Sequence, residues 1–124
     1  YEICACLVGS EMCIRDRCDL AQEEFWVLLL NQATKLIDKI RISSGGIDGT
    51  YADVRSILRE ALMQRATQIA VVHNHPSGNI QPSQPDRTLT EHIRKAADTM
   101  NIRLIDHVIV CEDGFYSFAD EGLL

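Results

Sequence analysis

Apolar residues follow two different spacings along most of the chain. Residues 25–30 (FWVLLL) form a continuous apolar run, typical of a strand buried on both faces, and residues 35–42 alternate in part, so the two segments together predict a hairpin. Residues 52–65 repeat apolar side chains at helical spacing, which predicts an amphipathic helix. Residues 68–73 (QIAVVH) predict another buried strand, and residues 74–82 contain two prolines and a glycine, which predicts a loop.

A second helix and two further strands are expected after this loop. Ser83 begins a Ser-x-x-Asp sequence, a helix-start signal, and apolar residues at helical spacing follow it as far as Met100. Residues 102–110 and 115–118 predict strands joined by the glycine-containing turn at residues 112–114. The predicted order is therefore strand, strand, helix, strand, helix, strand, strand. Buried strands mixed with two helices indicate a layered α/β fold.

Composition and charge restrict the classes of function. The 124 residues, 46% of them hydrophobic, suffice for one globular domain with a single core. Lys and Arg number 12 against 18 Asp and Glu, so the net charge of -6 does not support direct nucleic-acid binding. The chain contains neither an apolar stretch of the roughly 20 residues that span a bilayer nor a secretory signal pattern. We expect a cytoplasmic protein without membrane association, and the sequence carries no signal for an oligomeric state.

The first part of the chain does not share these patterns. Residues 1–17 show neither alternation nor helical periodicity, and residues 8–17 resemble a translated sequencing-adapter peptide. We therefore expect a non-native or disordered leader over residues 1–17 and one domain over residues 18–124, with an ordinary N-terminal strand or tail as the alternative. Four of the five cysteines fall within the first 18 residues without a Cys-x-x-Cys pair, which favours neither a disulfide framework nor a thiolate metal site.

Two histidines and an aspartate form the candidate metal-binding group. His73 and His75 lie two residues apart at the end of a predicted strand, where side chains at that spacing share a face. Neutral imidazole is a common zinc ligand, and a catalytic zinc has three protein ligands and one position open for water. Asp86, one helical turn past Ser83, can supply the third ligand if the loop folds back. Without a metal, the histidines are polar strand-end residues and Ser83 with Asp86 is a capping box.

The spacing of these residues matches a known motif in full. His73-x-His75, seven further residues, Ser83, two residues and Asp86 resemble the JAMM motif. The sequence HNHPSG at residues 73–78 is similar to the RadC branch of the JAB/MPN metalloprotease superfamily.

Other segments extend this resemblance over residues 20–124. LIDHVIV at residues 104–110 and FYSFADEGLL at residues 115–124 also resemble the RadC branch. The helical N-terminal region of full-length RadC proteins has no counterpart in the sequence, so the chain is similar to a short, stand-alone form. The resemblance implies a three-layer αβα sandwich with a mixed sheet, the fold of JAB/MPN and cytidine-deaminase-like proteins. The deaminase signature itself is absent, so deamination is not expected.

The resemblance also implies roles for individual residues. A zinc ion (Zn²⁺) would be bound by His73, His75 and Asp86, with Ser83 assisting the oxyanion that forms during hydrolysis. Glu23-Glu24-Phe25 resembles the Glu-x-Phe of the family, which selects Glu23 as the general base. Glu24 is the alternative, and only one of the two can face the metal because neighbouring strand residues point to opposite faces. For His107, on a predicted strand, core packing is expected and orientation of a ligand is the alternative.

The function implied is that of a JAMM-type zinc metallopeptidase. In this hypothesis, metal-activated water attacks an amide or isopeptide bond in a peptide or amide substrate that the sequence does not identify. The alternative is a zinc-binding, non-catalytic accessory module in DNA repair or mobile-element maintenance, a class associated with the RadC branch. Metal-dependent hydrolysis favours the first hypothesis, and salt-dependent affinity for DNA favours the second.

Overall fold

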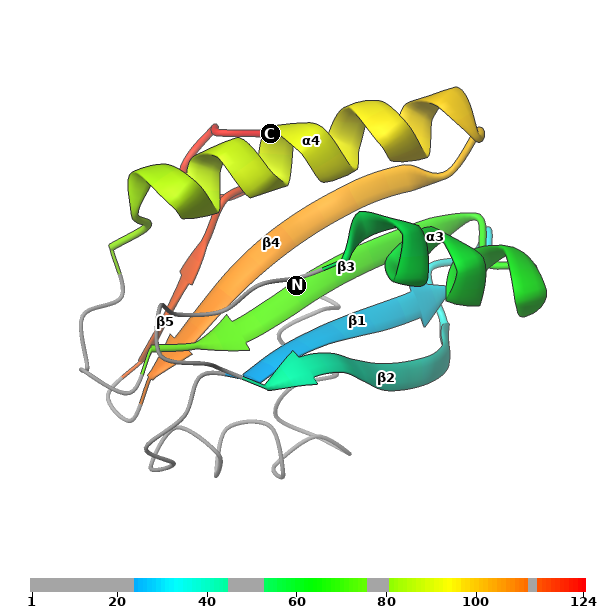
Figure 1. The fold of residues 1–124 in the computed structure, drawn as a ribbon, viewed down its shortest axis with the longest axis horizontal. Helices are drawn as coiled ribbons and strands as arrows, with labels where there is room; N and C mark the ends of the chain where they lie inside the picture. The colour runs from blue at the N-terminus through cyan, green and yellow to red at the C-terminus, as the bar shows by residue number, and fades with distance from the viewer. Residues whose placement is uncertain (1–23, 45–52, 76–80, 112–113) are drawn as a thin grey trace.

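The computed structural model describes residues 24–44, 53–75, 81–111 and 114–124. Its elements, in chain order, are β1 (Glu24–Leu30), β2 (Leu36–Ser44), α3 (Val54–Met63), β3 (Gln68–Asn74), α4 (Gln84–Thr99), β4 (Arg103–Cys111) and β5 (Gly114–Ser117). Figure 1 shows their arrangement. The predicted order of strands and helices is confirmed. The expected leader over residues 1–17 lies outside the described residues.

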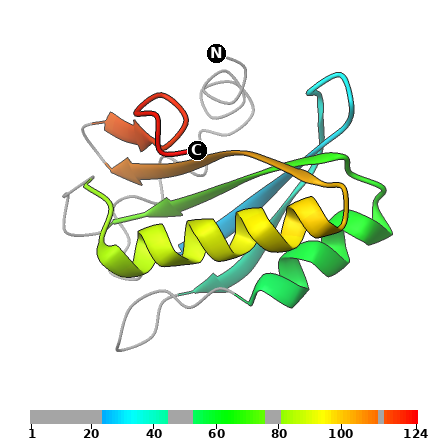
Figure 2. The ribbon, with the colours of Figure 1, turned by 90° about the horizontal axis from the view of Figure 1, so that it is seen from above.

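The described strands form one mixed five-stranded sheet in the order β2-β1-β3-β4-β5. Strand β1 pairs antiparallel with β2 and with β3, β3 pairs parallel with β4, and β4 pairs antiparallel with β5. Helix α4 lies between β3 and β4 in the chain and crosses over one face of the sheet. Figures 1 and 2 show that α3 and α4 cover the same face.

Two clusters of buried side chains lie on opposite faces of the sheet. The helix-side cluster includes Val27 and Leu29 of β1, Ile57 of α3 and Ile93 of α4. The far-side cluster includes Leu28 of β1 together with apolar residues of β3 and β4. Alternation along β1 therefore supplies apolar residues to both faces, which explains the continuous apolar run of this strand.

The α/β class with a mixed sheet is confirmed. Among the described residues the helices cover one face, so the second helical layer expected for an αβα sandwich is not seen in that part of the chain. The far-side cluster is nevertheless apolar and buried, as a sheet placed between two layers requires. None of the described helices has the length and apolar content to cross a membrane.

Strand β4 contains one residue more than its partner β3 at one point of their pairing. Ile69 pairs with Leu104 and Ala70 pairs with Asp106, which leaves Ile105 as an extra residue, a β-bulge. The bulge reverses the alternation, because Leu104 belongs to the helix-side cluster whereas Val108, four residues later, belongs to the far-side cluster. Side chains after the bulge therefore lie on the opposite face of the sheet from the one that they would occupy in an unbroken strand.

A matched pair of leucine substitutions tests the helix-side cluster. Leu29 is completely buried, whereas Leu62 on α3 is 47% exposed. We expect Leu29→Ala to lower the free energy of unfolding by about 2–5 kcal/mol, because it leaves a cavity in the core, and Leu62→Ala to change it by less than about 1 kcal/mol. Urea unfolding followed by circular dichroism measures both. Equal losses in the two variants would contradict the assignment of Leu29 to the core.

Candidate metal centre

The end of β3 and the start of α4 bring the predicted ligands together. His73 shares the helix side of β3 with Val71, two residues earlier. His75 follows the strand directly, and its backbone N–H donates to the carbonyl oxygen of Val110 at 3.1 Å. Asp86 lies in the first turn of α4. The end of β3 and the start of α4 lie at the same end of the molecule in Figure 1.

The three side chains converge on one point. One ligand atom from each of His73, His75 and Asp86 lies within 4.8 Å of the others. Nε2 of His73 is 3.4 Å from Oδ1 of Asp86, and Nε2 of His75 is 3.3 Å from Oδ2. The two Nε2 atoms are 2.9 Å apart. His73 is almost completely buried while His75 and Asp86 are partly exposed, so the group is open to solvent on one side.

Asp86 is also part of a capping box at the N-terminus of α4. The hydroxyl oxygen of Ser83 accepts a hydrogen bond from the backbone N–H of Asp86 at 3.2 Å. In return, Oδ2 of Asp86 accepts a hydrogen bond from the backbone N–H of Ser83 at 2.9 Å. The sequence offers two alternative roles for Asp86, in a capping box or beside the two histidines. In the structure Asp86 has both roles at once. The cap holds the carboxylate in the orientation that faces the two imidazoles.

The charge state of Asp86 follows from its surroundings. Burial raises the pKa of its carboxyl group, but hydrogen bonds with His73 and His75, the charge of His73 and the N–H of Ser83 lower it further than burial raises it. The net pKa lies far below the ordinary value for aspartate. Asp86 is therefore an ionised carboxylate at neutral pH, which is the form that binds metal ions.

His107 contacts His73 on the side of the ring that faces away from Asp86. Nε2 of His107 is 2.8 Å from Nδ1 of His73. Nδ1 of His107 is hydrogen-bonded to the hydroxyl oxygen of Thr90 on α4, and this hydroxyl also lies 2.8 Å from the backbone carbonyl oxygen of Asp86. Sequence reasoning did not single out Thr90. Its position four residues after Asp86, on the same side of the helix, was the available signal.

Two phenyl rings hold the His107 ring in the core. Phe118 stacks on it with ring centroids 4.6 Å apart and an interplanar angle of 8°, and Phe25 approaches it edge-on at 6.0 Å. Burial first, and then the charge of His73, lower the pKa of His107 well below its ordinary value, so the ring is neutral. The expected core packing is confirmed, and the ring also contacts a predicted ligand.

Asp106 fixes the turn that carries Phe118. Its Oδ2 accepts a hydrogen bond from the hydroxyl of Ser117 at 2.6 Å, and its Oδ1 accepts one from the backbone N–H of Ala119 at 3.0 Å. Asp106 is completely buried. The turn after β5 is thereby bound to β4, which keeps the phenyl ring of Phe118 against His107.

Glu24, the alternative general base, lies on the far side of the sheet. Its Oε1 accepts a hydrogen bond from the indole N–H of Trp26 at 3.1 Å, and its Oε2 is 3.8 Å from a guanidinium nitrogen of Arg41. Trp26 packs against the far-side cluster, whereas Phe25 belongs to the helix-side cluster and stacks with His73. The carboxylate of Glu24 therefore faces away from the ligand group. Glu23, the predicted base, lies outside the described residues.

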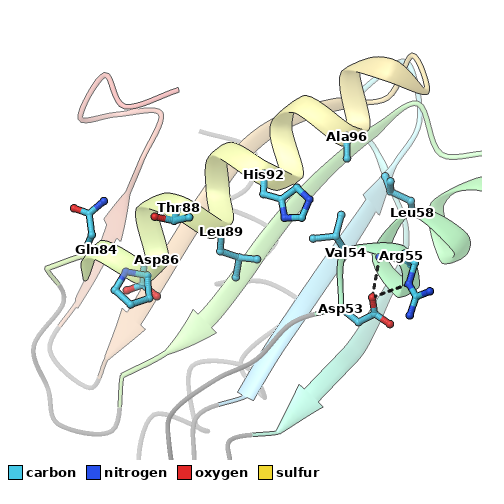
Figure 3. A pocket seen from close by; sticks show the side chains of 11 residues that line it. Asp53, Val54, Arg55, Leu58, Gln84, Asp86, Thr88, Leu89, His92 and Ala96 are labelled. Atoms are coloured by element: carbon cyan, nitrogen blue, oxygen red, sulfur yellow. Dashed lines mark hydrogen bonds and ion pairs between the residues drawn. The ribbon is translucent and has the colours of Figure 1, made fainter.

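A surface groove runs between α3 and α4 and includes Asp86 at one end. Its volume is about 820 Å³, within the range of ligand-binding sites. Figure 3 shows Val54 and Leu89 pointing toward one another across this groove, with Leu58 and His92 farther along it. The ligand group therefore lies beside a groove with apolar walls.

The profile of the RadC-like JAB domain matches residues 8–123 of this chain. The chain belongs to the RadC-like JAB domain family. It is 51% identical over 107 residues to a UPF0758 protein of Porphyromonas gingivalis, covering 86% of this chain and 47% of that protein. It is 45% identical over 105 residues to a UPF0758 protein of Flavobacterium johnsoniae, covering 85% and 46%. The UPF0758 protein YeeS of Escherichia coli is 39% identical over 116 residues, covering 94% and 78%.

The chain spans about half the length of the first two of these relatives. The family resemblance expected from HNHPSG and the JAMM spacing is thereby confirmed.

Substitutions of Ser83 test the capping box. We expect Ser83→Ala to lower the free energy of unfolding of the metal-free protein by about 1 kcal/mol, because the N–H of Asp86 loses its acceptor. Asparagine is as good a cap as serine, so Ser83→Asn should retain most of the stability. Chemical denaturation in the presence of a chelator measures both variants. If asparagine destabilised the RadC-like JAB domain as much as alanine does, the cap would not be the source of the loss.

Proposed function

We propose that this RadC-like JAB domain is a zinc-dependent hydrolase of the JAMM type, which cleaves an amide or isopeptide bond. The observation that carries the proposal is the convergence of His73, His75 and Asp86, whose ligand atoms lie within 4.8 Å of one another. Membership of the RadC-like JAB family supports it independently.

The donor set fits a catalytic zinc ion. Zinc accepts imidazole nitrogen and carboxylate oxygen, and catalytic zinc sites use three protein ligands so that one position remains for water or substrate. His73, His75 and Asp86 supply two imidazoles and one ionised carboxylate, and the group is partly exposed. When bound, zinc supplies a Lewis acid that makes water acidic enough to act as a nucleophile near neutral pH.

Glu23 is the proposed general base. A carboxylate near the site accepts the proton of the attacking water and returns it to the leaving amine. Its neighbour Glu24 has its carboxylate hydrogen-bonded to Trp26 on the far side of the sheet, and so takes no part in this transfer. The resemblance to the Glu-x-Phe pattern selects Glu23, and Phe25, the last residue of that pattern, stacks with His73.

Ser83 is the proposed oxyanion-stabilising residue. Its hydroxyl oxygen accepts the N–H of Asp86, and this bond does not use the hydroxyl proton. That proton can be donated to the carbonyl oxygen of a substrate as negative charge develops on it. The same serine would then both begin α4 and assist the reaction.

The groove between α3 and α4 is the proposed binding site for the substrate chain. Apolar side chains, including Val54 and Leu89, line it, and Asp86 at its end belongs to the ligand group. A peptide lying in this groove would present its scissile bond to His73, His75 and Asp86. An extended chain is the substrate shape that such an open groove accommodates.

Metal content provides the first test of this function. We expect the purified protein to contain about one zinc ion per chain, since a set of three ligands defines one site. His75→Ala removes one ligand and should lose the metal, whereas His92→Ala, an exposed residue that lies along the groove and outside the ligand group, should retain it. Inductively coupled plasma mass spectrometry after dialysis measures both. An equal zinc content in the two variants would contradict the ligand assignment.

The adjacent glutamates provide a matched test of the base. In zinc-loaded protein, Glu23→Gln should retain zinc and lose turnover by a factor of about 100 or more, since general acid–base catalysis contributes 10²–10⁴-fold. Glu24→Gln should retain both, because glutamine also accepts the indole N–H of Trp26. Hydrolysis of a library of lysine-linked isopeptides and linear peptides measures turnover.

The opposite pattern, loss of turnover in Glu24→Gln alone, would overturn the assignment of the base. Salt-dependent affinity for DNA without hydrolysis of any substrate in the library would favour the accessory-module hypothesis instead.

A further inference from the structure

The side chains of His107 and Thr90 join two of the proposed zinc ligands, His73 and Asp86, by a continuous series of hydrogen bonds. The series runs from Nδ1 of His73 to Nε2 of His107 at 2.8 Å, and from Nδ1 of His107 to the hydroxyl oxygen of Thr90. It ends at the backbone carbonyl oxygen of Asp86, 2.8 Å from the same hydroxyl. Each imidazole nitrogen in the series can donate or accept, depending on the tautomer of its ring. Only one group in the series has a fixed role as donor or acceptor. That group therefore decides which atom donates in each of the bonds.

That group is the carbonyl oxygen of Asp86, which can only accept. At 2.8 Å from it, the hydroxyl of Thr90 must donate its single proton to this carbonyl. The oxygen of Thr90 then has only lone pairs to offer His107, so Nδ1 of His107 carries a proton and donates it to Thr90. The opposite direction would place two lone pairs against one another at the carbonyl.

The tautomer of His73 follows from the same reasoning. His107 is completely buried between two phenyl rings, an environment that disfavours a charged ring, so a proton on its Nδ1 leaves a lone pair on its Nε2. Nδ1 of His73, 2.8 Å away, must therefore carry a proton and donate it. Its other ring nitrogen, Nε2, faces Asp86 and His75 and is then the one left to bind a metal.

We infer that Thr90 and His107 are positioning residues that hold a proton on Nδ1 of His73, so that Nε2 is the ring nitrogen left to bind the metal. The inference rests on the proposed function for the identity of the metal, but the proton on Nδ1 belongs to the metal-free protein as well. Hydrogen bonding to the second ring nitrogen fixes both the tautomer and the orientation of a metal-binding histidine. Here the chain of bonds ends at the backbone of Asp86, so the ring of His73 is anchored to the helix turn that carries a second ligand.

The packing of His107 prevents a rotation of the ring that would break this series. Phe118 stacks on its face and Phe25 meets its edge, so the ring plane is held on two sides. A flip of the ring by 180° within this plane would place carbon atoms opposite Thr90 and His73, and both hydrogen bonds would be lost. The buried hydrogen bonds and the aromatic contacts therefore favour a single orientation.

The wild-type protein provides the first test. Long-range ¹H–¹⁵N NMR correlations distinguish protonated from unprotonated imidazole nitrogens in each of the four histidines of the metal-free protein. We expect both His73 and His107 to show a protonated Nδ1 at neutral pH, and His107 to show an unprotonated Nε2. An unprotonated Nδ1 on His73 would overturn the inference. This measurement needs no substitution and no bound metal.

Substitution of Thr90 tests the consequence for the metal. Thr90→Val keeps the size of the side chain and removes the acceptor of Nδ1–H of His107, so the tautomer of His73 is no longer imposed. We expect a 10- to 100-fold loss of zinc affinity in Thr90→Val, the usual effect of removing such an outer contact, and recovery in Thr90→Ser, which restores the hydroxyl. Competition with a fluorescent zinc chelator measures the affinity.

Thr99→Val is the matched control, because the Thr99 hydroxyl donates to the carbonyl oxygen of Lys95 in the same way but is exposed. Its zinc affinity should equal that of the wild type. Thermal unfolding and the NMR spectrum of each variant show whether it is folded.

The outcomes separate this inference from the proposed function. Unchanged affinity and an unchanged His73 tautomer in folded Thr90→Val would overturn the role of Thr90 while leaving the zinc site intact. Conversely, the expected tautomer in a protein that binds no zinc would refute the proposed function and support the hydrogen-bond direction. Loss of affinity in Thr90→Val with recovery in Thr90→Ser supports both.

Discussion

The pairing of β3 with β4 contains one extra residue, Ile105, and the arrangement of the candidate metal centre depends on it. Because the bulge reverses the alternation of β4, His107 faces the helix side with His73, while Asp106 faces the opposite side and binds Ser117. Without the extra residue, Asp106 would take the helix side and His107 would point away from the ligands. Bulges are frequent beside functional sites, where they redirect a side chain. In this chain a single inserted position decides which residue supports His73.

The ligand group uses interactions that the fold also needs. Asp86 caps α4 through Ser83 and at the same time faces His73 and His75, so the helix start fixes the position of the carboxylate. Thr90 satisfies a carbonyl of the same helix turn while it binds His107. The bond between Thr90 and His107 is buried and the bond from Thr90 to the carbonyl is partly buried, where a polar group without a partner costs about 1–3 kcal/mol. A site constructed from such contacts is preorganised, because the ligands are already close together before a metal binds.

Much of the fold was predictable because its elements have clear periodicity. The apolar run of β1 and the helical spacing of α3 and α4 predict the order of elements, and the spacing of His73, His75, Ser83 and Asp86 predicts which residues meet. The choice between Glu23 and Glu24 was harder, because residues 25–30 are apolar at every position and do not reveal which face the helices cover. The contact between His107 and His73 was only an alternative to core packing in the sequence, since it joins residues 34 positions apart and depends on a bulge that leaves no signal in the apolar pattern.

The central claim is that two imidazoles and one carboxylate hold a single zinc ion with an open position. X-ray absorption spectroscopy at the zinc edge of the loaded protein tests it most directly, because it reports the type and distance of the atoms around the metal. The account predicts two imidazole nitrogens at about 2.0–2.1 Å and oxygen ligands at about 2.0–2.2 Å, from Asp86 and from water, with no sulfur. Sulfur at about 2.3 Å, the distance of cysteine ligands, or only one imidazole in the shell, would contradict the assignment of the ligand group.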